Sequence, residues 1–151
     1  MSYAVQIVAN EFLDLAKRDG ELLDPMKIQK LVYLAHGWNL ALRGEPLVRQ
    51  EVEAWPYGPV ISSLYQEFKK FRASPITERA SSPKGENLSD NPRRLIEAVW
   101  KRYRQFSSIQ LSMLTHESGF AWDLTIKERG PFSVIPNELI RDEFVRRRQR
   151  K

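Results

Sequence analysis

Hydrophobic residues recur at helical spacing through the first third of the chain. Within residues 3–18 they fall every three or four positions, which is typical of a helix with one buried face. A second helix is predicted from Pro25 to Arg43, because Asp24 can accept hydrogen bonds from free backbone N–H groups at its start and Gly44 can end it. The apolar residues of this helix form a wide stripe on its surface, so we expect the helix at the centre of the core.

The pattern changes after Gly44. Partial alternation of apolar and polar residues between Pro46 and Trp55 predicts a short strand or extended edge. Pro56 and Pro59 then bracket Tyr57-Gly58, and proline restricts the backbone on both sides. We therefore expect a rigid turn that continues neither neighbouring element. Helical spacing resumes from Val60 to Phe71, with Pro59 suited to the first turn.

Residues 72–91 interrupt the helical pattern. They are rich in Ser, Pro, Lys, Glu and Gly, with Ile76 and Leu88 as their large aliphatic residues. This composition predicts a long exposed loop, which is either functional or simply flexible. Asn91-Pro92 begins another helix, which is predicted to bury an apolar face and to expose a basic one.

Short elements follow in the last third. Ser107 and Gln110 form a capping-box pattern at the start of a short helix, which Ser118-Gly119 should stop. A further short helix is predicted over 120–129, and residues 132–135 are a candidate second strand that pairs with the first.

The last helix is predicted to run from Asn137 to about Arg147 and to continue into a basic tail at 146–151. The fold class is therefore mainly α with a minor β hairpin or ribbon, arranged as a compact helical bundle. A length of 151 residues suits one domain, so we expect a single domain over 1–151.

Composition limits the chemistry and the cellular location that we expect for this chain. The chain has no cysteine, which excludes disulfides, cysteine zinc sites and thiol nucleophiles. Its first residues lack the basic and apolar stretches of a signal peptide, and no apolar run reaches the ~20 residues that span a bilayer. We therefore expect a cytoplasmic protein without membrane contact.

Charge is distributed unevenly along the chain. Residues 1–24 contain five acidic and two basic side chains, whereas residues 93–104 contain five basic and one acidic. Arg93, Arg94 and the C-terminal arginines could neutralise phosphates, which keeps nucleic-acid binding open. The acidic first segment and the lack of a recognisable base-reading helix favour an acidic protein surface instead.

Residues suited to catalysis are scarce. His36 lies beside the apolar stripe of its helix and is interpreted as structural, and His116-Glu117 lacks a second ligand at helical spacing. Glu51 and Glu53 could share one side of a strand, but a solvated strand edge is the simpler interpretation. We therefore expect no catalytic residue, no metal site, no cofactor and no enzymatic activity.

Three sequence signatures resemble one known family. The first covers residues 25–42 and 44–47. The second is the motif EAWPYGPV at 53–60 with its following apolar positions. The third consists of Leu111-Ser112, Thr115-His116 and Trp122. In order and spacing these signatures are similar to the Panacea domain of SocA-like antitoxins, a family that includes phage-associated proteins called GepA. Ala121 departs from the pattern, because a proline commonly precedes the tryptophan.

The resemblance implies an antitoxin. Such a protein holds a cognate toxin inactive by direct binding, or delivers it to an ATP-dependent protease, so both proteins are implied partners. The rival classes are a DNA-binding regulator and, less favoured, a small hydrolase in which His116 and Glu53 would act.

Exposed aromatic residues beside a fixed turn suit an interface, because little entropy is lost when they dock. Tyr57 is the first such residue to test. The partner-binding surface is expected to include Trp55, Tyr57, Gly58, Pro59, His116, Trp122, Arg93 and Arg94.

Overall fold

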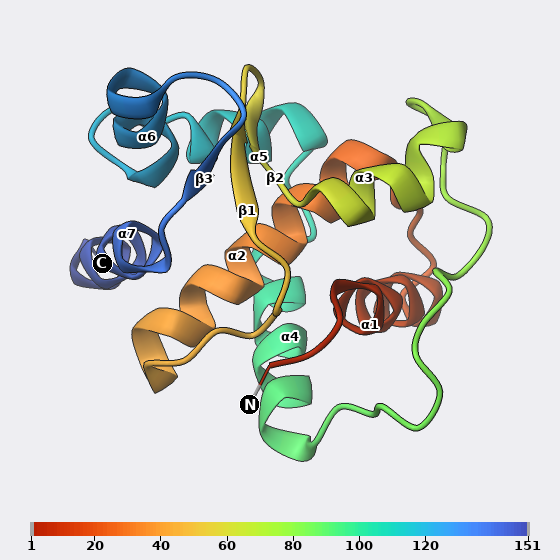
Figure 1. Cartoon of the computed structure of the whole chain (residues 1–151). Coiled ribbons are helices and arrows are strands. Elements are labelled where there is room, and N and C mark those ends of the chain that lie inside the picture. Colours follow the sequence, from red (N-terminus) through yellow and green to blue (C-terminus); the bar gives the residue numbers. More distant parts are fainter. Residues whose placement is uncertain (1, 151) are drawn as a thin grey trace.

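A long buried helix organises the computed structural model, which describes residues 2–150 (Figure 1). This helix, α2 (Pro25–Arg43), packs against α1 (Val5–Arg18), α3 (Ser62–Phe68), α4 (Asp90–Tyr103), α5 (Ser108–Thr115) and α7 (Asn137–Gln149). A short 3-10 helix, η1 (Lys69–Phe71), extends α3, and α6 (Ala121–Arg129) precedes the last strand. The mainly helical fold with a small sheet confirms the predicted fold class.

The ends of α2 follow from its sequence. The Asp24 carboxylate accepts a hydrogen bond of 2.8 Å from the backbone N–H of Lys27, and Pro25 occupies the first turn, where its missing donor is not needed. Gly44 takes the left-handed conformation with φ 74° and ends the helix. Every residue from 28 to 40 is buried, which confirms the predicted central position of this helix.

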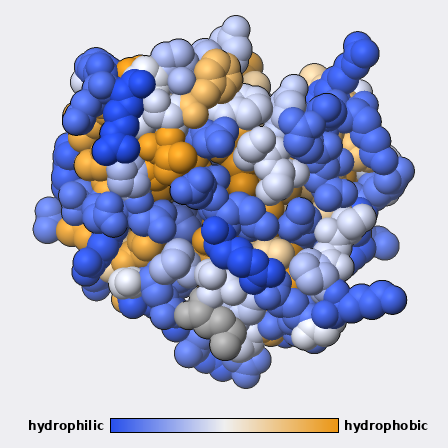
Figure 2. Space-filling model, in the orientation of Figure 1, coloured by the Kyte–Doolittle hydropathy of each residue, from blue (hydrophilic) through white to orange (hydrophobic). Residues whose placement is uncertain are grey.

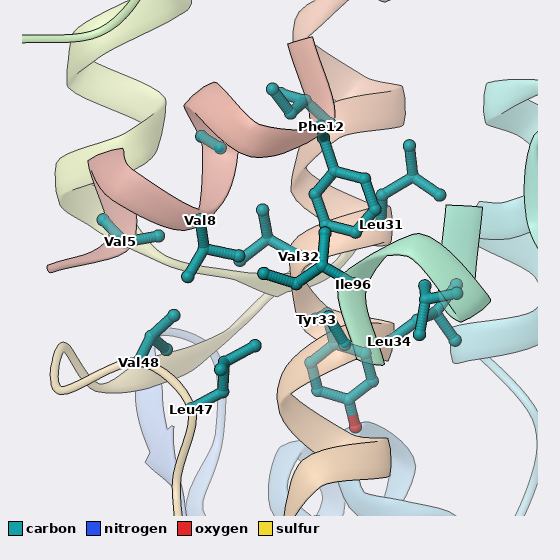
Figure 3. Close-up of a cluster of buried hydrophobic side chains, with 14 of the residues drawn as sticks. Val5, Val8, Phe12, Leu31, Val32, Tyr33, Leu34, Leu47, Val48 and Ile96 are labelled. Carbon is teal, nitrogen blue, oxygen red and sulfur yellow. The ribbon is translucent and has the colours of Figure 1, made fainter. Parts of the chain in front are cut away.

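Side chains from three other parts of the chain meet around α2 (Figure 3). Helix α1 contributes Val5, Val8 and Phe12, α4 contributes Ile96, and the segment after α2 contributes Leu47 and Val48, all of them buried. The core is therefore built mainly from contacts between helices, and the sheet lies at its edge.

Gly37 allows α7 to approach α2 closely. A Cβ atom at this position would lie 2.1 Å from the Phe144 ring. The same ring makes edge contacts with Tyr33 and Trp38, at centroid distances of 5.7 and 5.4 Å. The absence of a side chain at Gly37 is thus what gives this aromatic cluster its room.

The sheet has the strand order β2-β1-β3 and is antiparallel throughout. Strand β1 (Val52–Trp55) pairs with β2 (Gly58–Val60) as a hairpin and with β3 (Ser133–Ile135), which confirms the predicted pairing of the two sequence-derived strands.

The predicted turn over 56–59 is wrong in its second half. Gly58 and Pro59 belong to β2, opposite Trp55 and Ala54, and only Pro56 and Tyr57 connect the strands. Proline is tolerated here because β2 is an edge strand. Pro59 consequently lies outside α3, which begins at Ser62.

The irregular segment 72–89 is attached to the rest of the protein at buried points. It passes α1 on its way to α4 (Figure 1), and most of its residues are exposed as predicted, but Ile76, Ala80 and Leu88 are buried. The Asn10 side chain donates to the Ala80 carbonyl at 3.0 Å and accepts from its N–H at 2.7 Å. These contacts fix the middle of the segment against α1.

The expected basic tail is largely helical, because α7 continues to Gln149, and Lys151 lies outside the described residues. Arg147 is buried and bonds the buried Glu143 carboxylate at 2.9 Å, while the Tyr33 hydroxyl donates to Glu143 at 2.8 Å. Burial raises the pKa of Glu143, against the opposing effect of Arg147 and Tyr33. Part of the terminal positive charge is therefore used inside the fold.

His36 has a structural role, in agreement with the sequence interpretation. Its Nδ1 accepts from the backbone N–H groups of Leu47 and Val48, each at 3.3 Å. Its Nε2 must then carry the proton and donate to the Asn137 side-chain oxygen at 3.0 Å. Burial lowers the pKa of His36, so the ring stays neutral and joins α2 to the following segment and to α7.

Replacing Gly37 by alanine should lower the free energy of unfolding by about 1–3 kcal/mol, although alanine normally favours helices. The added methyl group would collide with the Phe144 ring. Urea denaturation measures the change. In a Phe144→Leu background the same substitution should cost less, and equal costs in both backgrounds would contradict this origin.

Stability should also fall on acidification because of His36. Its pKa is lower in the folded state than the ordinary value of 6.5, so its contribution is complete above pH 6.5 and is lost as pH decreases through the folded pKa. Denaturation of the wild type and of His36→Gln between pH 7.5 and 5 tests this. The variant should be less stable at pH 7.5, and the difference should shrink toward acid; a constant difference argues against a buried neutral histidine.

Candidate functional site

The β1–β2 hairpin presents Tyr57 to solvent. Its turn leaves this side chain 81% exposed, whereas Trp55, two residues earlier, is only half-buried and packs on its neighbours. The Trp55 ring lies 5.0 Å from that of Tyr65 and 5.6 Å from that of Phe132, and its Nε1 donates to Glu53 at 2.9 Å. The exposed tyrosine therefore projects from a base that is already packed.

Helices α5 and α6 hold the back of this hairpin. Trp122 donates from Nε1 to the Trp55 carbonyl at 2.7 Å, and its ring makes an edge contact with His116 at 4.4 Å. His116 Nδ1 lies 2.6 Å from the Ser112 carbonyl, which makes Nδ1 the donor. Trp122 and His116, which were expected at the partner-binding surface, thus support the hairpin.

Gly58 is required by the close approach of α2. Its φ of 125° lies in the region that favours glycine, and a Cβ atom there would lie 2.8 Å from Lys30 Nζ and 3.3 Å from His116 Cε1. The neighbouring Pro59 is buried and offers its carbonyl to the same lysine. A larger residue at position 58 would be strained by this backbone conformation and would have to displace the Lys30 amine.

Lys30 attaches the hairpin to α2 and was missed by sequence reasoning. Its side chain is buried, and Nζ donates to the Pro59 carbonyl at 3.1 Å. Burial lowers the pKa of Lys30 to about 8. The adjacent Gln29 bonds both the N–H and the carbonyl of Ile61, at 3.1 and 3.0 Å. Two long polar residues inside an apolar stripe were the signal that could have revealed this attachment.

An apolar hollow of about 430 Å³ lies beside the hairpin turn. The hairpin hollow, as we name it, is lined by Met26, Tyr57, Ile109, Ser112, Met113 and His116. Its large apolar residues are unusually exposed, with Ile109 and Met113 each at 68%. Sequence reasoning named Tyr57 and His116 but missed the other members of this cluster, because they come from α2 and α5, which are far apart in sequence.

Arg93 and Arg94 lie apart from the hairpin, near the start of α4. Arg93 is 3.7 Å from the Glu11 carboxylate, and Arg94 lines a different hollow, together with Trp38 and Leu42. The structure thus brings together six of the eight predicted partner-binding residues and separates the two arginines from them.

The other chemical candidates do not converge. Glu51 precedes β1, and the Glu53 carboxylate already accepts from Trp55. Within residues 2–150, no group of three or more His, Asp or Glu side chains is arranged to hold a metal ion. No helix in the same range is both long enough and apolar enough to span a bilayer.

Hydrophilic residues cover most of the face shown in Figure 2. Hydrophobic residues gather mainly at its upper left, in the area that β1 and β3 occupy in Figure 1. Exposed apolar surface on this face is thus concentrated around the sheet.

Comparisons with known proteins agree with the sequence signatures. The family described as "Antitoxin SocA-like, Panacea domain" matches residues 28–123, a range that includes the hairpin and most of α2. Antitoxin SocA of Caulobacter vibrioides (strain NA1000 / CB15N) is 32% identical over 136 residues, which cover 82% of this chain and 70% of that protein. The comparison with solved structures found no match.

Lys30 should make stability rise between about pH 8 and pH 10. Its folded pKa of about 8 lies below the ordinary 10.5, so its contribution is complete above pH 10.5 and is lost as pH falls through about 8. Lys30→Met should flatten this rise in denaturation experiments. Lys84→Met, at an exposed lysine, is the control and should keep it. An unchanged rise in Lys30→Met would mean that this amine is not desolvated.

Proposed function

Since the chain belongs to the SocA-like antitoxin family with the Panacea domain, we propose that it neutralises a cognate toxin by direct protein binding through the hairpin hollow. The antitoxin role rests on the family and on the relative named antitoxin SocA. The observation that supports this particular surface is the exposed apolar cluster around Tyr57.

Tyr57 has the properties of an interface anchor. Its ring is exposed, while the backbone on both sides is restricted by Pro56 and by the pairing of Gly58 with Trp55. Docking this ring therefore costs little additional ordering of the chain. Tyrosine also combines a large apolar body with a hydroxyl that can bond at the edge of an interface.

The residues around Tyr57 complete an apolar contact area. Met26 and Met113 have flexible side chains that adapt to the shape of a partner, and Ile109 adds a branched apolar group. Large apolar side chains gathered at the surface favour association, because covering them removes apolar area from water. A toxin bound there would cover an area that is otherwise unfavourably hydrated.

Direct binding is also the first step if the antitoxin delivers its toxin to an ATP-dependent protease. The two outcomes differ in the fate of the toxin, which stays intact in a blocking complex and disappears during delivery. Toxin levels in cells that produce both proteins, with and without the protease, distinguish them.

The rival functions have less support. A hydrolase would need reactive groups that converge, but His116 uses its Nδ1 on the Ser112 carbonyl while the Glu53 carboxylate already accepts from Trp55. A DNA-binding regulator has less support because part of the basic charge around α4 is compensated: Arg93 lies beside Glu11, and Arg104 bonds Asp19 and Glu21.

Co-expression with each flanking gene product should identify one that arrests growth alone, is neutralised by this chain and co-purifies with it. Tyr57→Ala and Ile109→Asp should each weaken this complex roughly tenfold or more, as expected for residues central to an interface. Calorimetry measures the affinity, and circular dichroism checks the fold.

Leu22→Asp is the matched control, because Leu22 is 74% exposed but does not line the hairpin hollow. It should leave binding unchanged. If Tyr57→Ala and Ile109→Asp bind the toxin as tightly as the wild type, the hairpin hollow is not the toxin-binding surface. If no flanking product is neutralised or bound, the proposed function itself is wrong.

A further inference from the structure

Four arginines from three helices line one hollow of about 720 Å³, which we name the arginine hollow. They are Arg43 at the end of α2, Arg94 and Arg102 on α4, and Arg148 on α7. No acidic residue lines this hollow. Like charges held near one another raise the electrostatic energy of the fold unless an anion compensates them.

These four guanidinium groups have no carboxylate partner within residues 2–150. Elsewhere the fold does supply such partners, as for Arg18 with Asp19 and Glu97, and for Arg49 with Glu86. Among the described residues, Arg129 and Arg141 likewise have no carboxylate partner, but neither lines this hollow. Arginines without a carboxylate partner thus occur both in this concave surface and elsewhere on the basic chain.

The floor of the arginine hollow is mainly aliphatic. The Arg102 guanidinium lies over the rings of Trp38 and Tyr103, at 5.1 and 5.4 Å, and Trp38 Nε1 donates to the Tyr103 hydroxyl at 3.0 Å. The polar groups of both aromatic residues are thus already satisfied. Leu42, half exposed, and the exposed Ala98 remain available to an apolar partner.

The spacing along α4 suits a helical partner. Arg94, Ala98 and Arg102 follow one another at intervals of four residues and so share one face of the helix. The two arginines are roughly 12 Å apart along the axis at 1.5 Å per residue. The small side chain of Ala98 between them leaves space for an inserted apolar group.

We propose that the arginine hollow receives an acidic amphipathic helix of the toxin, whose apolar side chains contact Leu42 and Ala98 and whose carboxylates pair with the surrounding arginines. Arginine binds carboxylates in a two-pronged geometry, and a groove between helices is a common receptor for an amphipathic helix. This inference rests on the proposed function and adds a second contact area to the hairpin hollow.

A nucleic acid fits this hollow less well. Its phosphates would pair with the arginines, but its bases would need accessible aromatic faces on which to stack. Trp38 and Tyr103 are 6% and 5% exposed and lie beneath Arg102. An aliphatic floor matches apolar side chains better than a sugar-phosphate backbone.

The test measures binding of the flanking gene product that the wild-type chain neutralises. Arg94→Glu combined with Arg148→Glu should weaken binding roughly 10- to 100-fold and should reduce its sensitivity to salt. Both side chains are exposed, so the fold should persist. Arg129→Glu combined with Arg141→Glu changes the net charge equally outside the hollow and should weaken binding much less.

Ala98→Leu tests the shape of the site without changing charge. The larger side chain should fill the space between Arg94 and Arg102 and weaken toxin binding, whereas Ala73→Leu, at an exposed position in the irregular segment, should not. The proposal is overturned if Arg94→Glu/Arg148→Glu and Ala98→Leu both bind the toxin normally while Tyr57→Ala does not. It is also overturned if the arginine variant loses binding only to duplex DNA. If the wild-type chain binds no toxin, the proposed function has failed instead.

Discussion

The burial of α2 on every side from residue 28 to residue 40 is the constraint on which the rest of the fold depends. A helix covered on every side needs a neighbour for each face, and helices from both halves of the chain supply these neighbours. Its polar residues must also find partners inside the protein, because an unpaired buried polar group is costly. Lys30 bonds the backbone of β2, and Gln29 bonds the backbone of the residue that follows β2. His36 bonds the backbone of the segment after α2 and the side chain of Asn137. These polar side chains therefore fix the sheet and the start of α7 on the helix.

This attachment gives the two proposed contact areas their different chemistry. Near the start of α2, the hairpin is held so that Tyr57 stands beside apolar residues of α5. Near the end of α2, α4 and α7 bring arginines together above an aliphatic floor. A partner that touches both areas would contact the two ends of one rigid helix, so its position and orientation would both be defined.

Local signals in the sequence predicted the helices well. Asp24, Pro25 and Gly44 fixed the ends of α2, and the capping box of Ser107 and Gln110 forms as expected. These features act within a few residues of the chain, so no tertiary knowledge was needed. The family signatures also contained Gly58, Trp122 and His116, but as expected partner-binding residues rather than as parts of a hairpin and its support.

Features that depend on distant contacts were missed. The turn prediction failed at Gly58 and Pro59 because they pair with Trp55 and Ala54, and Lys30, which is remote in sequence, also bonds the Pro59 carbonyl. The buried pair of Glu143 and Arg147 looked like surface charge, since Tyr33 and the interior around it were not visible.

The attachment of the irregular segment has a different consequence. Residues 82–85 are exposed between the buried Ala80 and Glu86, whose carboxylate bonds Arg49 and the backbone of Ala4. Because loop closure depends only weakly on length, this short stretch can lengthen in related chains while α1 and α4 keep their places.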